Sequence, residues 1–193
     1  MEASSEFVFL GYRVKRPWAP GPGWEPIELV CNAGDDMCEP PDGWVERWDW
    51  NRASCYATPE AAWATVTEDS DGYRLFAYDL LPFRFGGAHP PTAVPLDEIF
   101  RNDVAKFPDQ MFETPAMTEI GYDVAEKNLP VDSFPYSPLV TNGFAGEFTV
   151  NLYGLIVDLA VATEACSAIN EAMPEHGSHW VVRILWDADR TTG

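Results

Sequence analysis

A helical pattern followed at once by a strand, in the last third of the chain, constrains the fold most. After Asp158, apolar residues recur at positions i, i+3, i+4, i+7 and i+11, and Pro174 ends the run. This spacing predicts an amphipathic helix with one apolar stripe. The stripe consists of Ala162, Ala165, Cys166, Ile169 and Met173.

The residues that follow, 179–186, read HWVVRILW and predict a closing strand that is apolar on both sides. Side chains alternate across a strand, so the two sides can be read from the sequence. One side carries Trp180, Val182, Ile184 and Trp186, and the other carries His179, Val181, Arg183 and Leu185. We therefore expect residues 179–186 to form the closing strand of the fold.

An earlier segment repeats the same order of elements. Thr58, Pro59 and Glu60 are a favoured start for a helix that we expect to run to about Thr67, and a long strand is expected over 73–85. Two such units predict an α+β fold, with a mostly antiparallel sheet and two or three helices packed on one face. Identity between the copies is too low to demonstrate a duplication.

The remaining patterns complete the expected layout. Strands are expected over residues 6–18, 117–128 and 147–157, with a short helix over 43–52 and a weaker one over 96–107. The length fits one domain spanning residues 1–193. Residues 17–43 carry six of the 17 prolines and are expected to form an irregular, Pro- and Trp-rich insertion.

The net charge of −19 restricts the possible partners. A surface of that sign repels nucleic-acid phosphates and anionic lipid, so we expect neither nucleic-acid nor membrane binding. It favours a basic protein partner, although adaptation to high salt would also produce it. No targeting segment or long apolar run is recognisable, so a cytoplasmic location with reduced Cys31, Cys38, Cys55 and Cys166 is expected.

Motifs for phosphate, dinucleotide or metal binding are missing from the sequence, and no cofactor is expected. Cys31 and Cys38 lie at a spacing that matches no zinc motif. His176 and His179 are three residues apart, but Pro174 and Gly177 favour a turn there. We therefore interpret these histidines as turn residues that enter a strand.

The first candidate surface is residues 35–50, which we call the acidic Trp-rich segment. Its charged and aromatic residues are Asp35, Asp36, Glu39, Asp42, Trp44, Glu46, Trp48, Asp49 and Trp50. Carboxylates interleaved with tryptophans can supply both long-range attraction and a desolvated anchor. Trp44 and Trp48 lie one helical turn apart, and Trp50 lies off that face, so Trp50 is the expected exposed anchor.

The second candidate surface is residues 137–147, which we call the polar loop. Its candidate residues are Ser137, Thr141, Asn142 and Glu147. Pro138 and the Asn142-Gly143 pair are sufficient for a tight turn, so the loop is either a turn or a recognition loop. A nucleophilic role for Ser137 needs a base, which His176 or His179 could supply only through the fold.

Together these features predict an acidic protein-binding domain rather than an enzyme. The hypothesis is an inhibitor or immunity-type antagonist of a basic partner, such as a toxin or a nuclease. The alternative is a small-molecule transferase or hydrolase whose pocket gathers scattered polar residues. The candidates for that pocket are Arg13, Ser137, Asn142, Glu147 and His179.

Overall fold

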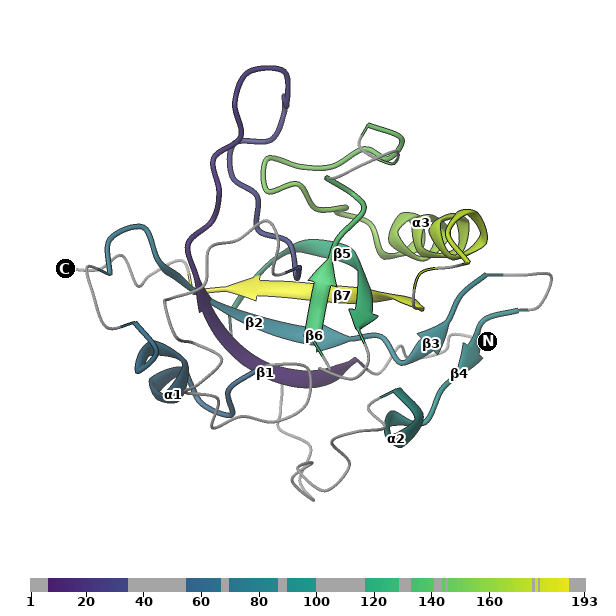
Figure 1. The fold of residues 1–193 in the computed structure, drawn as a ribbon, viewed down its shortest axis with the longest axis horizontal. Coiled ribbons are helices and arrows are strands. Elements are labelled where there is room, and N and C mark those ends of the chain that lie inside the picture. The colour runs from purple at the N-terminus through teal and green to yellow at the C-terminus, as the bar shows by residue number, and fades with distance from the viewer. Residues whose placement is uncertain are drawn as a thin grey trace.

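The protein is built around a five-stranded sheet in the order β1-β2-β7-β5-β6 (Figure 1). This computed structural model describes residues 7–34, 55–66, 70–86, 90–99, 117–128, 133–140, 144, 146–174, 176 and 178–187. The strands are β1 (Val8–Lys15), β2 (Arg74–Leu80), β5 (Thr118–Asn128), β6 (Ser133–Tyr136) and β7 (His179–Trp186). Every pairing in this sheet is antiparallel. Strands β3 (Phe83–Arg84) and β4 (Thr92–Ala93) form a separate small sheet.

The helices begin where the sequence predicts. In α3 (Leu159–Ala172) the side chain of Asp158 accepts hydrogen bonds from the first backbone N–H groups. Thr58 caps α1 (Pro59–Trp63) in the same way, although this helix ends earlier than predicted. The short α2 is Leu96–Ile99. The stripe predicted for α3 is confirmed at Ala162, Ala165, Cys166 and Ile169, which are buried, whereas Met173 is the C-cap residue and is only partly buried.

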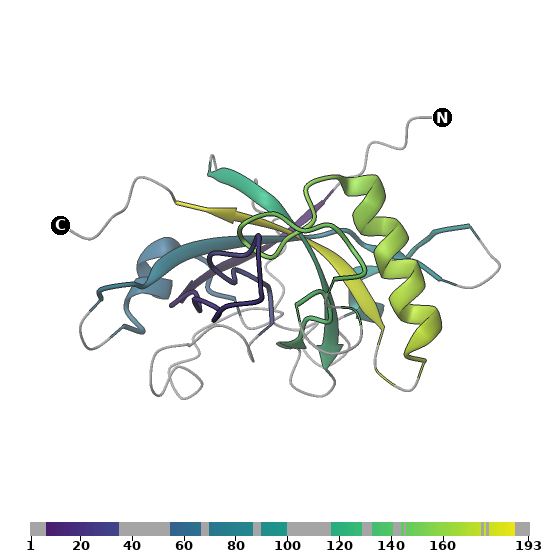
Figure 2. The same ribbon diagram turned by 90° about the horizontal axis from the view of Figure 1, so that it is seen from above.

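The two faces of the sheet are covered differently. Cross-strand pairing places Val14, Leu75, Val124 and Val181 on one face, which we call the helix face. There α1 packs on β1 and β2, and α3 packs on β5 and β7, at opposite ends of the molecule (Figure 2). The other face, which we call the loop face, is covered by loop residues and by Ile99 of α2, so the helices do not all pack on one face as predicted. Its cluster joins strand residues such as Phe76 and Ile184 to Cys31, Cys55, Val94 and Leu155.

The α+β class and the antiparallel sheet are therefore confirmed, with less helix than predicted. Within the described part of the chain, only α3 is longer than five residues. The strand predicted over 179–186 is also confirmed as β7, which lies between β2 and β5 and is buried along almost its whole length. The helix predicted over 43–52 and most of the one predicted over 96–107 lie outside the described residues.

The strand predicted over 147–157 is wrong. That segment is a series of turns, with one isolated bridge between Ile156 and Tyr122. The side-chain oxygen of Asn151 accepts hydrogen bonds from the backbone N–H groups of Tyr153 and Leu155. Gly154 adopts a φ of +72°. These bonds turn the backbone back on itself, which a ladder of strand hydrogen bonds cannot accommodate.

One further prediction needs correction, and one strand contains an irregularity. The strand expected over 73–85 is broken at Pro82, which lacks a backbone donor, and resumes only as the two-residue β3. In β5, a register shift between Glu119 and Gly121 sends Ile120 into the cluster of the loop face, whereas Tyr122 packs toward α3. A Cβ atom at Gly121 would lie 2.8 Å from Cβ of Leu155, which explains the glycine.

Within the ranges described above, no helix has the length and apolar character needed to cross a bilayer.

Candidate functional site

The structure describes only part of the predicted site. All nine residues named in the acidic Trp-rich segment lie outside the described residues, as do Thr141 and Asn142 of the polar loop. Of the remaining candidates, Ser137 and Glu147 belong to the polar loop, and Arg13 and His179 belong to strands β1 and β7. The site is therefore built from these residues and from the hollows around them.

Ser137 is fully buried against the loop face. Its hydroxyl donates to Oδ1 of Asp123 over 2.5 Å. Asp123 is itself fully buried and also accepts hydrogen bonds from the backbone N–H groups of Val124 (2.8 Å) and Ala33 (2.7 Å). Burial raises the pKa of Asp123, while its hydrogen-bond donors and the charge of Lys15 act against that rise.

Lys15 extends this interior network. Its Nζ donates to the carbonyl oxygens of Gly34 at 2.5 Å and Asn32 at 3.4 Å, so β1 is tied to the loop that covers the sheet. The carboxylate of Asp123 holds the same loop through Ala33. Ser137, Asp123 and Lys15 therefore anchor a loop, and their polar groups point at protein rather than at solvent.

His179 lies on the helix face, where Asn170 of α3 holds it. The backbone N–H of His179 donates to Oδ1 of Asn170 at 2.8 Å, and the ring Nδ1 lies 3.2 Å from the same oxygen. Burial lowers the pKa of His179 to about 4, so its ring is uncharged at neutral pH. The ring Nε2 has no hydrogen-bond partner within the described structure.

Ser137 and His179 are not brought together. His179 pairs with Glu126 across the sheet, and Glu126 lies three residues from Asp123 in a regular stretch of β5. Side chains at this odd spacing point to opposite faces. Ser137 hydrogen-bonds on one face and His179 on the other, so the structure does not pair this serine with this histidine. Arg13 is buried and lies opposite Phe76, on the loop face.

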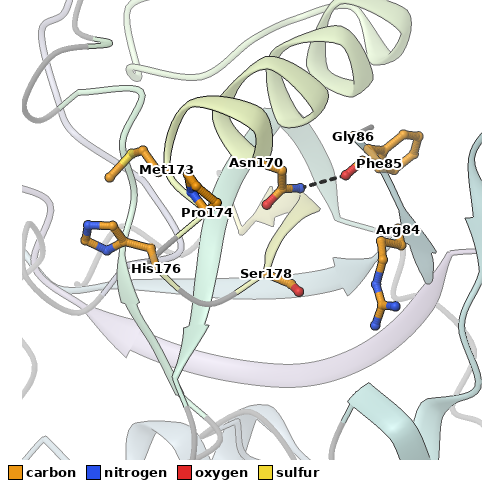
Figure 3. Close-up of a pocket in the computed structure, with 8 residues that line it drawn as sticks. All are labelled: Arg84, Phe85, Gly86, Asn170, Met173, Pro174, His176 and Ser178. Atoms are coloured by element: carbon orange, nitrogen blue, oxygen red, sulfur yellow. Dashed lines mark hydrogen bonds between the residues drawn. The ribbon is translucent and has the colours of Figure 1, made fainter. Parts of the chain in front are cut away.

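A first hollow lies beside His179, at the end of α3 (Figure 3). It has a volume of about 280 Å³, and Asn170 stands between Arg84 and His176. Nδ2 of Asn170 donates to the carbonyl oxygen of Phe85 at 3.0 Å. Arg84 pairs with Glu98 at 3.1 Å, and His176 lies 3.4 Å from a carboxylate oxygen of Glu126. The charged and imidazole groups of this hollow therefore already have partners.

A larger groove, of about 450 Å³, lies between residues 23–27 and residues 139–150. Figure 1 shows the purple segment before residue 34 rising above the sheet beside the green segment that follows β6. The backbone N–H groups of Glu28 and Leu29 donate to the carbonyl oxygen of Leu152 and hold the two segments together. We call this hollow the two-loop groove.

The two-loop groove has a buried apolar floor and a more exposed rim. Leu139 and Val140 are buried, and Trp24, Ile27, Phe148 and Val150 are partly buried. The charged residues among its described lining are Glu25 and Glu147, both exposed. Neither carboxylate forms an ion pair with any described residue.

Glu147 belongs to a surface predicted from the sequence, but most of this groove was not predicted. Trp24 and Ile27 were assigned only to an irregular insertion, and residues 147–157 were interpreted as a strand. The sequence signal for this groove is Trp24 beside Glu25 and Pro26. These residues lie in an irregular segment, which cannot bury an indole ring without another part of the chain. The residues that line the groove together with this segment lie more than 100 positions later in the chain, and the sequence pattern does not identify them.

Metal binding has no assembled ligand set here, since the described residues contain no group of three or more His, Cys, Asp or Glu side chains placed to hold an ion. Comparisons with protein-family models, with curated proteins and with solved structures found no match.

Proposed function

We propose that this protein is a non-enzymatic binding domain for a basic protein, acting as an inhibitor or immunity-type antagonist of a partner such as a toxin or a nuclease. The observation that carries the proposal is the two-loop groove, which has an apolar floor and is also lined by Glu25 and Glu147, neither of which has a cationic partner among the described residues. A chain of net charge −19 gains association rate and selectivity from a partner of opposite charge.

The polar interior groups support the same conclusion. Ser137 is engaged by Asp123, Lys15 by backbone carbonyls, and His179 by Asn170. Serine, lysine and histidine are common in the active sites of hydrolases and transferases. Here their side chains instead connect strands of the sheet to a covering loop or to α3. The separation of Ser137 from His179 therefore supports a recognition role over a serine–histidine catalytic pair.

The proposal assigns the partner surface to the acidic Trp-rich segment, with the two-loop groove as a further contact. Immobilised protein should capture a basic protein from a lysate of its native host, and association kinetics with that purified partner give the test. Reversing Asp35, Asp36 and Glu39 to lysine should slow association and reduce its dependence on salt. Trp50→Ala should mainly speed dissociation, by roughly thirtyfold for an anchoring tryptophan.

Glu164→Lys is the matched control, because it also reverses an exposed carboxylate but lies on α3 outside the groove. This variant should leave the kinetics close to those of the wild type. Capture of a partner that is not basic would contradict the proposal. An association rate that changes neither with salt nor in the variants with reversed charges would also contradict it.

A further inference from the structure

We propose that the two-loop groove is a docking site for an arginine- or lysine-bearing loop or strand of the partner, with a large apolar side chain beside the cation. This inference rests on the proposed function and names the chemistry that one part of its surface recognises. It is argued from three properties of the groove: its gradient of burial, its charge and its flanking exposed residues.

The gradient of burial provides a place for an apolar side chain. Leu139 and Val140 form a floor that is 2% and 1% exposed, and Phe148 and Val150 stand partly buried above it. A volume of about 450 Å³ falls within the range of sites that bind small ligands, roughly 300–1,000 Å³. An apolar group that enters the groove therefore displaces water from a preformed apolar surface.

The charge of the groove selects a cation. Glu25 comes from one segment and Glu147 from the other, so both sides of the groove carry a carboxylate. No lysine, arginine or histidine appears among the described lining residues. Attraction between charges strengthens beside an apolar wall, where water is partly excluded, and arginine is enriched at the anchoring positions of interfaces.

The exposed residues next to the groove extend the contact. Trp18 is 41% exposed and packs edge-to-face on Trp24, at 5.6 Å between ring centroids. Leu152 is 40% exposed and accepts backbone hydrogen bonds from Glu28 and Leu29, next to Ile27 of the lining. An aromatic and an aliphatic side chain thus flank the acid-lined groove and widen it into a surface suited to a partner segment.

Charge also argues against the most obvious competing occupant, a second copy of this chain. Each copy carries a net charge of −19 and would bring another acidic surface to an acidic groove. A basic segment gains attraction at the same place, which is why we commit to that occupant.

The test uses the whole protein and two short synthetic peptides with blocked ends, of sequence Arg-Leu-Arg-Phe-Arg and the same sequence with citrulline in place of each arginine. Backbone amide NMR should show the arginine peptide shifting the signals of Glu25, Gly146, Glu147 and Thr149. The citrulline peptide keeps the shape and loses the charge, so it should bind about tenfold more weakly or worse.

Glu25→Gln and Glu147→Gln should each weaken the arginine peptide by about fivefold, and Glu164→Gln should leave its affinity unchanged. Thr149→Trp places a bulky side chain on the exposed rim and should reduce binding of both peptides. All four positions are exposed, so the amide spectrum should confirm that each variant is folded.

Three outcomes would overturn the inference. Equal affinity for both peptides would identify an apolar site without charge selection. Concentration-dependent shifts of the same amides without peptide would identify a second copy as the occupant. Shifts confined to residues 35–50 would reject the groove while leaving the proposed function intact, whereas capture of no basic partner would reject the function itself.

Discussion

The hydroxyl of Ser137 donates to Oδ1 of Asp123 over 2.5 Å, and both side chains are fully buried. A carboxylate is kept in an interior only when donors and charges compensate for lost water. Here Ser137 supplies one donor, backbone N–H groups supply two more, and the Lys15 ammonium contributes an opposing charge. The most nucleophile-like residue of the polar loop therefore serves the stability of the fold.

Ser137→Ala should destabilise the protein by roughly 1–3 kcal/mol, because it leaves a buried carboxylate oxygen short of a donor. Urea unfolding monitored by tryptophan fluorescence measures the loss. Thr149→Ala, at an exposed position, is the control and should change the stability little. Folded Ser137→Ala protein should bind the partner as wild type does; a collapse of binding at unchanged stability would move the functional site to the polar loop.

Arg183→Met should be strongly destabilising. Its guanidinium pairs across the strands with fully buried Asp79, with Nε at 2.8 Å from a carboxylate oxygen, and also lies over the ring of Phe7. Removing the cation takes away the cross-strand partner of this carboxylate, and breaking a buried ion pair typically costs about 3–5 kcal/mol. Adding Asp79→Asn should recover part of the loss in the midpoint of urea unfolding, and equal stabilities of single and double variants would contradict this account.

Stability should fall with acidification through His179. Its folded-state pKa is about 4, below the ordinary value of 6.5, so protonation favours the unfolded chain. The contribution is fully present above pH 6.5 and is lost as the pH falls from there through about 4. Free energies of unfolding measured across this window should decline more steeply for the wild type than for His179→Gln, which does not titrate. If the free energies of unfolding of the two proteins fall in parallel with pH, His179 is not the group responsible.

The thiols should resist alkylation in the native state. Cys31, Cys55 and Cys166 are buried, and burial raises the pKa of Cys166 well above its usual value, which suppresses the reactive thiolate. Mass spectrometry after alkylation should find these three unmodified in native protein and all four cysteines modified after unfolding. A Cys31–Cys38 bridge in freshly isolated protein would contradict the prediction.

Nucleic acid should not bind at physiological salt. The net charge of −19 opposes the phosphate backbone, and the chain has only 12 lysine and arginine residues in total. Fluorescence anisotropy with labelled duplex DNA and RNA should therefore show no change at micromolar protein, with a basic protein of known binding as the positive control. A salt-sensitive rise in anisotropy would count against the charge argument.

The sequence alone determined the elements whose cause is local. Asp158 and the spacing of apolar residues define α3, because a cap and a helical period need only neighbouring residues. The run of aromatic and β-branched residues over 179–186 likewise identified the closing strand, β7. The overall charge, and the partners that it disfavours, follow from composition.

The tertiary structure alone decided what distant segments do to one another. Residues 147–157 alternate like a strand, yet Asn151 captures the nearby backbone N–H groups and also donates to the carbonyl oxygen of Ile120 in β5. Whether this segment forms turns or a strand thus depended on which hydrogen-bonding groups the tertiary structure places near Asn151. Ser137 became an interior donor, and Glu25 came to line the same groove as Glu147, for the same reason. A long-range hydrogen bond or a groove needs two segments of the chain to come together, and a local sequence pattern describes only one of those segments.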